Sequence, residues 1–279
     1  MPPLRQLLAE AAARLQSAGV AQSRLTAELL LAHALGRERS YLYAHPEETP
    51  DPASFLDLIA RRVAGEPMQY LTGVQEFFGR SFAVSPAVLI PRPETELVIA
   101  AALELIPGDA PARIADVGTG SGCLAVTLAL ERPRAVVIAT DISPAALALA
   151  RRNADALGAR VDFLESDLLA AAPGHFDLIV SNPPYIPDSE WATLQREVRD
   201  HEPRLALLAG PTGAEVYARL IPQAHAALRP GGGLVLELGY NSAPAVRALL
   251  TADAWGSVWT RRDAQGWERV LTARRMSDS

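Results

Sequence analysis

Cysteine is almost absent from this chain, and long apolar runs are absent altogether. The single cysteine, Cys123, excludes an intramolecular disulfide framework and a cysteine-rich zinc site. No apolar run approaches the length of a membrane span, and the first residues lack the hydrophobic region of a secretory signal. The five histidines are scattered without the close spacing of metal ligands. We therefore expect a soluble, cytoplasmic protein with no metal and no membrane contact.

Basic residues are also fewer than acidic ones. The 26 Lys and Arg residues face 32 Asp and Glu residues, which gives a formal net charge of −6 and a pI of about 5.5. Proteins that bind nucleic acid duplexes usually carry a basic face, so we expect no direct nucleic-acid target. With 279 residues, of which 49% are hydrophobic, the chain is long enough for one large domain and a small one.

A glycine-rich loop follows the first predicted strand of the larger domain. Residues 112–117 are typical of a buried strand, and a helical stretch, 123–130, begins directly after the loop. Glycine lets a ligand approach the backbone closely, and the free N–H groups at a helix start face that ligand. On its own such a loop serves a nucleotide cofactor or only a tight turn, and both readings stay open. The loop consists of Gly118, Thr119, Gly120, Ser121 and Gly122.

Two acidic residues flank this loop. Asp141 ends the next predicted strand, 135–140, and an acidic residue about 20 positions beyond a glycine loop can bind both hydroxyls of a ribose. Its alternative role is to cap the helix that begins near Pro144, although the surrounding loop favours the ribose. Asp116 either orients the glycine loop or faces an amino group of the cofactor.

The tetrapeptide Asn182-Pro183-Pro184-Tyr185 follows another apolar, strand-like run, residues 176–181. Two consecutive prolines fix two φ angles and remove two backbone donors, so the Pro183 carbonyl is held in a stiff turn beside the Asn182 amide oxygen. Two acceptors and an aromatic face suit a planar nitrogen that carries two N–H bonds. An amide or an amino nitrogen is such a group. The alternative is a turn that ends a strand and buries a tyrosine.

In combination, the glycine loop, Asp141 and the Asn-Pro-Pro-Tyr tetrapeptide resemble S-adenosylmethionine-dependent methyltransferases that modify planar nitrogen. Further segments narrow the resemblance to the release-factor glutamine methyltransferases: 88–96, 116–122, 180–187, 202–204 and 236–240. The resemblance covers nearly the whole chain. It implies a Rossmann-like α/β methyltransferase domain that uses S-adenosylmethionine and releases S-adenosylhomocysteine. The implied reaction is methyl transfer to the side-chain nitrogen (N5) of the glutamine in the Gly-Gly-Gln motif of class I peptide chain release factors.

The resemblance also assigns roles to individual residues. The cofactor would lie against Asp116, the five loop residues, Asp141, Asn182, and the pair Asp167-Leu168 beside the adenine. Relatives often carry an aromatic residue where Leu168 stands, and leucine cannot stack on adenine as an aromatic ring does. Asp167 could equally be a residue of a surface turn. Asn182 Oδ1 and the Pro183 carbonyl would accept the two N–H bonds of the glutamine. Tyr185 would pack on the planar amide, and Pro184 would stiffen the turn.

Three further charged residues have open roles. Arg92 and Glu96 lie in the proline-rich segment that the resemblance places near the cofactor, but they could equally form a salt bridge one helical turn apart. Glu237 ends a predicted strand near the proposed site, where a carboxylate is commonly structural.

The order of predicted elements divides the chain into a helical N-terminal domain (1–72), a hairpin linker (73–92) and a catalytic domain (93–279). The helical pattern leaves open whether the N-terminal domain is a structural cap or a platform for the protein substrate, and the resemblance implies substrate recognition. Strands alternate with helices in the catalytic domain, which predicts a mostly parallel sheet covered on both faces. The predicted strands are 113–117, 135–140, 161–164, 176–181 and 233–238, with a terminal strand pair in 258–273. The predicted helices are 121–131, 144–157, 190–199, 213–228 and 242–250.

Other functions remain open on the residues alone. The same tetrapeptide would suit an adenine-N6 methyltransferase that acts on a flipped base, or a glutamine methyltransferase of a ribosomal protein. A non-catalytic nucleotide-binding module is a further alternative. The acidic balance of the chain and the lack of an insertion long enough for a target-recognition domain argue against the nucleic-acid enzyme. We expect a monomeric methyltransferase with release factors as its partners.

Overall fold

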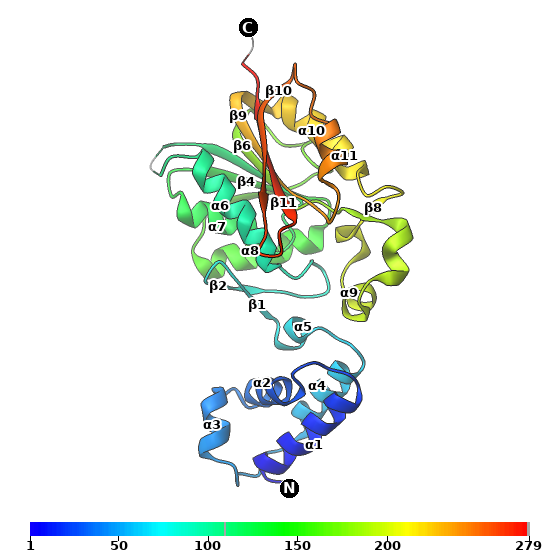
Figure 1. Ribbon diagram of the computed structural model, residues 1–279. Helices are drawn as coiled ribbons and strands as arrows, with labels where there is room; N and C mark the ends of the chain where they lie inside the picture. The colour runs from blue at the N-terminus through cyan, green and yellow to red at the C-terminus, as the bar shows by residue number, and fades with distance from the viewer. Residues whose placement is uncertain (109, 278–279) are drawn as a thin grey trace. The chain divides into compact units, whose positions relative to one another are not determined.

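The computed structural model describes residues 1–108 and 110–277 (Figure 1). This chain divides into two compact units, Met1–Val74 with Gln195–His201, and Gln75–Leu194 with Glu202–Ser279. No helix of the described residues is both long enough and apolar enough to cross a membrane. Residues 1–72, predicted to recognise the substrate, all fall within the first unit.

The first unit is a small helical bundle. Helix α1 buries one face, because its apolar residues recur three and four positions apart and pack into a core that belongs to this unit alone. Helix α2 ends at Gly36, whose left-handed backbone (φ 60°) lets the Gly36 and Arg37 N–H groups donate back to the last turn. The helices are α1 (Leu4–Ser17), α2 (Ser23–Leu35), α3 (Arg39–Ala44), α4 (Ala53–Val63) and α5 (Met68–Thr72).

A distant segment, α9 (Arg196–His201), completes this unit. Arg62 of α4, a buried residue, forms an ion pair with Glu197 of α9. The prediction of one helix over 190–199 is therefore wrong. The 3₁₀ helix η2 (Asp188–Thr193) stops at Leu194, whose extended backbone (φ −61°, ψ 149°) separates it from α9.

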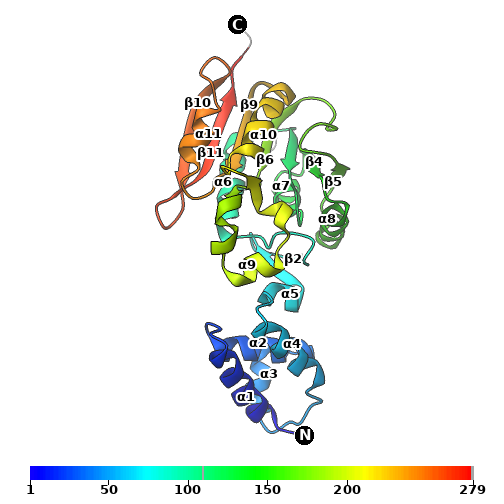
Figure 2. The same cartoon turned by 90° about the vertical axis from the view of Figure 1, so that its right-hand side faces the viewer.

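The predicted hairpin consists of β1 (Val74–Phe77) and β2 (Arg80–Ala83), and all of it except Val74 belongs to the second unit. A seven-stranded sheet follows in the same unit. The strand order is β10-β11-β9-β6-β3-β4-β5; β5, β4, β3, β6 and β9 are parallel, and β11 and β10 are antiparallel additions. The strands are β3 (Arg113–Val117), β4 (Val136–Asp141), β5 (Val161–Glu165), β6 (Phe176–Ser181), β9 (Leu228–Glu237), β10 (Trp255–Arg262) and β11 (Glu268–Arg275). In Figure 2 the β10–β11 hairpin forms one edge of the sheet, and β5 forms the other.

Helices cover both faces of this sheet (Figure 1). Because successive strand residues point to opposite faces, Ile114 and Leu178 pack into one core with α6 and α7, whereas Ala115 and Ile179 pack into a second core with α10 and α11. The helices are η1 (Pro93–Thr95), α6 (Glu96–Leu105), α7 (Cys123–Glu131), α8 (Pro144–Leu157), η3 (Arg204–Ala206), α10 (Glu215–Ala227) and α11 (Ala243–Ala248), and a two-stranded ribbon, β7 (Ile186–Pro187) with β8 (Leu208–Gly210), lies outside the sheet. The predicted α/β architecture is confirmed.

The sheet brings the predicted functional segments to one edge. Val117, at the end of β3, is in register with Thr140 of β4 on one side and with Ser181 of β6 on the other. The chain runs from β3 outward to β4 and later returns to place β6 on the opposite side of β3. A crevice outside the carboxyl ends of the strands at such a reversal is where ligands bind in open α/β sheets.

Candidate active site

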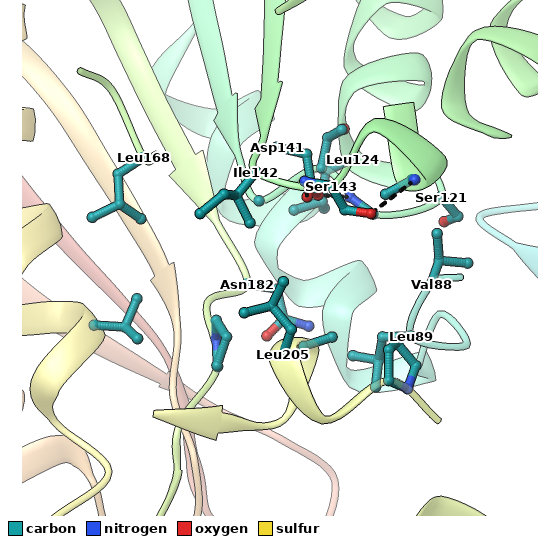
Figure 3. A pocket seen from close by; sticks show the side chains of 18 of the residues that line it. Val88, Leu89, Ser121, Leu124, Asp141, Ile142, Ser143, Leu168, Asn182 and Leu205 are labelled. Carbon is teal, nitrogen blue, oxygen red and sulfur yellow. Dashed lines mark hydrogen bonds between the residues drawn. The ribbon is translucent and has the colours of Figure 1, made fainter. Parts of the chain in front are cut away.

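A cavity of about 390 Å³ opens at the carboxyl edge of the sheet. Four segments predicted from the sequence line it: the glycine loop, Asp141, the pair Asp167 and Leu168, and the tetrapeptide (Figure 3). The remaining walls come from residues between 87 and 91, from Thr95, from the starts of α7 and α8 with Ile142, from Ser166, and from residues between Pro203 and Arg219. The loop, Asp141, Asn182 and Pro184 therefore share one cavity although 66 positions separate Gly118 from Pro184 in the sequence.

Asp116 holds the glycine loop in place through two hydrogen bonds. Its Oδ2 accepts hydrogen bonds from the Thr119 hydroxyl at 2.6 Å and from the Ala125 N–H at 3.1 Å. The side chain is fully buried, does not line the cavity, and leaves Oδ1 without a partner among the described residues. Burial raises the pKa of Asp116 to about 7. Of the two roles considered for this residue, these contacts support the orientation of the loop.

Gly122 is where the loop turns into α7. Its φ of 82° is left-handed, and a Cβ built there would lie 3.1 Å from the Cβ of Ala150 in α8. Only glycine meets both conditions without strain. The close approach brings the start of α7 against α8, whereas Gly118, Thr119, Gly120 and Ser121 face the cavity.

The Asp141 carboxylate lies between the glycine loop and the start of α8. Its Oδ2 accepts from the Gly120 N–H and its Oδ1 from the Ser143 N–H, both at 2.9 Å. Burial raises the pKa of this carboxyl group above its ordinary value. Ser143, whose hydroxyl accepts from the Ala146 N–H at 3.2 Å, caps α8. The alternative role of Asp141 as the helix cap is therefore wrong, and its carboxylate borders the cavity (Figure 3).

The Asp167-Leu168 pair forms another part of the cavity wall. Asp167 is half-exposed and forms an ion pair with Arg219 of α10. Leu168 has a left-handed backbone (φ 54°), and its apolar side chain borders the cavity (Figure 3). Asp167 therefore forms a surface ion pair and also lines the cavity together with Leu168.

The tetrapeptide continues directly from β6. The Ser181 hydroxyl donates to the Val117 carbonyl at 2.6 Å and ties the end of β6 to β3. The Asn182 Nδ2 donates to Thr95 Oγ1 at 3.2 Å, and Asn182 and Pro184 line the cavity. Pro183 is buried, and neither it nor Tyr185 is part of the lining.

Tyr185 packs against the backbone beyond β9. A Cβ built on Gly239 would lie 2.6 Å from Cδ2 of the Tyr185 ring, so only glycine leaves room for the ring there. Burial raises the pKa of the Tyr185 hydroxyl above its ordinary value. The ring thereby supports the tetrapeptide turn from the side of β9.

Comparison with known proteins assigns this arrangement to a family. Residues 6–73 match the family model described as PrmC N-terminal domain, and residues 98–205 match the Methyltransferase small domain. A release factor glutamine methyltransferase of Koribacter versatilis is 47% identical over 277 residues, which cover 98% of both chains. Proteins with the same description are 48% identical in Moorella thermoacetica, over 99% of both chains, and 47% identical in Deinococcus radiodurans, over 98% of both.

The chain belongs to the release factor glutamine methyltransferase family. The resemblance inferred from the motifs is thereby confirmed. Among solved structures, a methyltransferase from Pyrococcus furiosus shares the fold with a TM-score of 0.54 at 19% identity, over 78% of this chain and 97% of that one. A 16S rRNA N2 G1207 methyltransferase from T. thermophilus reaches a TM-score of 0.54 at 22% identity, over 72% and 49%. These distant likenesses confirm the predicted methyltransferase fold.

Arg92 and Glu96 do not pair with each other in this member of the family. Arg92 forms an ion pair with Glu202, whose Oε2 also accepts from the Ile90 N–H at 3.1 Å. Glu96 Oε1 accepts from the Phe78 N–H at 2.8 Å. The salt bridge considered between Arg92 and Glu96 is therefore wrong. Glu202, buried and more than a hundred positions away, joins the two segments that flank the cavity.

Several lining residues were missed by sequence reasoning. The family resemblance pointed to segments 88–96 and 202–204, but not to individual residues within them. Leu205 and Leu208 follow no recognisable motif, although Leu205 is an exposed leucine, 61% accessible, and borders the cavity (Figure 3). Thr95 was likewise unremarkable in the sequence, and its contact with Asn182 spans 87 positions.

Proposed function

We propose that this protein transfers a methyl group from S-adenosylmethionine to the N5 nitrogen of the glutamine in the Gly-Gly-Gln motif of class I peptide chain release factors. The observation that carries the proposal is the single cavity that places Asp141 and the glycine loop opposite Asn182. Membership in the release factor glutamine methyltransferase family supports the acceptor. A planar nitrogen with two N–H bonds is the chemistry that the tetrapeptide suits.

The residues of the cavity fit S-adenosylmethionine. Each oxygen of the Asp141 carboxylate already accepts one backbone N–H, and each keeps a further lone pair for a ribose hydroxyl. Leu124, Ile142 and Leu168 supply apolar walls. A cavity of about 390 Å³ lies within the size range of sites for small ligands. When bound, S-adenosylmethionine supplies a methyl group activated by the positive charge on sulfur.

The tetrapeptide would hold the acceptor amide. The nitrogen of a glutamine side chain is a weak nucleophile because its lone pair is delocalised into the carbonyl group. Asn182 Oδ1 and the Pro183 carbonyl would accept its two N–H bonds and so aim its out-of-plane electron density at the methyl carbon. As the bond from the methyl carbon to sulfur breaks and the bond to nitrogen forms, positive charge would grow on the nitrogen and strengthen both hydrogen bonds, and stabilisation that is specific to the transition state raises the rate. The methylated nitrogen would then release one of its two protons to solvent, which gives the neutral amide. Alignment also removes much of the entropic cost of the reaction.

The N-terminal helical unit, residues 1–72 in our division, would recognise the release factor. The exposed apolar side chains of Leu29 and Leu56 on its helices offer a surface for a protein partner. We further propose that the enzyme acts as a monomer in the cytoplasm, where translation takes place.

Methyl transfer is tested with purified protein, methyl-labelled S-adenosylmethionine and a purified class I release factor. We expect label on the glutamine of the Gly-Gly-Gln motif, located by mass spectrometry of the digested factor. The matched control is the same release factor with this glutamine replaced by asparagine. Label on DNA, or no label on the intact factor from a folded enzyme, would overturn the proposal.

A further inference from the structure

Thr95 connects Asn182, the side chain proposed to bind the substrate glutamine, to a buried carboxylate. It ends η1, is 2% exposed, and accepts the Asn182 Nδ2–H bond on its Oγ1 at 3.2 Å. A threonine hydroxyl has a single proton to donate. Glu237 follows Leu236, which is in register with Ser181 just before Asn182, so Glu237 and Asn182 leave neighbouring strands side by side. A hydrogen bond from Thr95 offsets part of the effect of burial on the pKa of the Glu237 carboxyl group. The three side chains form a directed chain from Asn182 through Thr95 to Glu237.

The direction of this chain fixes which way the Asn182 amide faces. Because its NH₂ group points to Thr95, its Oδ1 lies at the opposite edge of the planar amide group. The reverse orientation would offer N–H bonds to the N–H bonds of a glutamine, and the two sets of donors would repel each other. An asparagine on an open surface rotates between both orientations at little cost. A hydrogen-bond partner that only accepts from Asn182 removes that freedom.

Glu237 sets the direction at the far end. It is the last residue of β9, is 1% exposed, and its Oε2 has no partner among the described residues. Its ionised form accepts only, so the Thr95 proton must point toward it and the Thr95 lone pairs toward Asn182.

We propose that Thr95 and Glu237 are positioning residues that hold the Asn182 amide with its oxygen toward the acceptor nitrogen. The proposal rests on the proposed methyl transfer, because it assigns to these residues the orientation of the group that binds the glutamine. Neither residue needs to touch the substrate. Their effect on the reaction passes entirely through Asn182.

Substitution of Thr95 tests the hydrogen-bond chain from Asn182 to Glu237. In Thr95→Val the shape is kept and the hydroxyl is lost, and we expect kcat to fall about tenfold or more, the equivalent of about 1.4 kcal/mol, with KM for the release factor nearly unchanged. Thr95→Ser restores the hydroxyl and should recover most of the rate. The matched control is Thr127→Val, which removes a buried hydroxyl without a partner in α7, and it should keep the full rate.

Substitution of Glu237 tests the direction. Burial raises the pKa of Glu237 to about 7, so the wild-type kcat should fall as the pH drops below about 7, where the protonated carboxyl group itself becomes a donor. The Glu237→Gln variant should have a low kcat at every pH, and its kcat should not fall further as the pH drops below about 7. Thr95→Val combined with Glu237→Gln should be no slower than Thr95→Val alone, because both changes break one chain. The titratable groups that interact with Glu237 are Arg92, Glu94, Cys123, Tyr185, Tyr217 and Arg269.

The outcomes separate this proposal from the reaction on which it rests. If the wild-type protein fails to methylate the release factor, the proposed function fails. If the wild-type protein is active and folded Thr95→Val matches it in kcat, the positioning role is wrong. A serine variant that rescues nothing, additive losses in the double variant, or a kcat of Glu237→Gln that still falls as the pH drops below about 7 would also overturn the positioning role.

Discussion

Asn182 borders the cavity, and its amide nitrogen donates to Thr95. Asn182→Ala should therefore remove an acceptor for the substrate while leaving the glycine loop and Asp141 in place. We expect methyl transfer to fall by about 100-fold or more, as when one donor of an oxyanion hole is lost. Calorimetric titration should show that S-adenosylmethionine still binds with nearly unchanged affinity. Full methylation by the folded variant would rule out the role assigned to this side chain.

Asp116 is a residue whose buried charge should make stability depend on pH. Its pKa is raised from 3.8 to about 7 by burial, so the folded state binds a proton that the unfolded state has already lost. Between about pH 4 and pH 7 the contribution of this residue to stability therefore falls as the pH rises. Asp116→Asn keeps an oxygen for Thr119 and Ala125 and cannot ionise.

The measurement for Asp116 is urea unfolding of both proteins, without cofactor, at several pH values. We expect the difference in unfolding free energy between variant and wild type to shift in favour of the variant as the pH rises from about 4 to 7. A difference that stays constant over this range would show that Asp116 titrates at its ordinary pKa.

At the scale of single elements, the junction between the glycine loop and α7 depends on Gly122. Gly122→Ala places a Cβ at φ 82° and 3.1 Å from the Cβ of Ala150, so it adds a packing clash to the cost of a left-handed backbone. Gly158→Ala, at the end of α8, is the matched control: φ is 71° and a Cβ there would meet nothing within 4 Å. The control should lose about 1–2 kcal/mol of unfolding free energy, and Gly122→Ala should lose more.

Urea unfolding gives both values for this pair of glycines. Equal losses at the two positions would show that α8 yields to the added methyl group. We also expect only Gly122→Ala to weaken the binding of S-adenosylmethionine, since only this glycine belongs to the loop that lines the cavity.

Elements were predictable where the signal is local. Two strands lie where the sequence predicts them, at 113–117 before the glycine loop and at 176–181 before the tetrapeptide. Each is marked by its own apolar run and by the turn residues that follow it. Strand β9 begins at Leu228 rather than at residue 233, although Pro230 and the glycines after it are residues that usually interrupt a strand. In the structure this stretch pairs with the start of β6, with a register shift between Phe176 and Leu178.

Contacts between distant residues were beyond the reach of a single sequence. Nothing near Arg92 indicates that Glu202, rather than Glu96, is its partner. Nothing near Thr95 indicates that its hydroxyl accepts from Asn182. The residues with specific chemistry could be named from their motifs, but the side chains that orient them depend on which strands become neighbours.

At the scale of the whole molecule, the chain holds two units with separate hydrophobic cores. Every residue that lines the proposed cofactor site belongs to the second unit. A ligand stabilises the part of a protein to which it binds by an amount that grows with its concentration relative to Kd, about 2.7 kcal/mol at 100 times Kd. Two units that share no core, with the cofactor site in only one of them, therefore predict an unequal response to the cofactor.

We expect scanning calorimetry to resolve two unfolding transitions, of which S-adenosylmethionine raises only the Tm of the larger. The larger transition belongs to the second unit, because enthalpy of unfolding scales with the number of residues. Asp141→Ala, which removes the predicted ribose ligand, is the control and should abolish most of the shift. A single transition that moves as a whole would show that the two units unfold together, and the binding energy of the cofactor would then also stabilise the helical unit proposed to recognise the release factor.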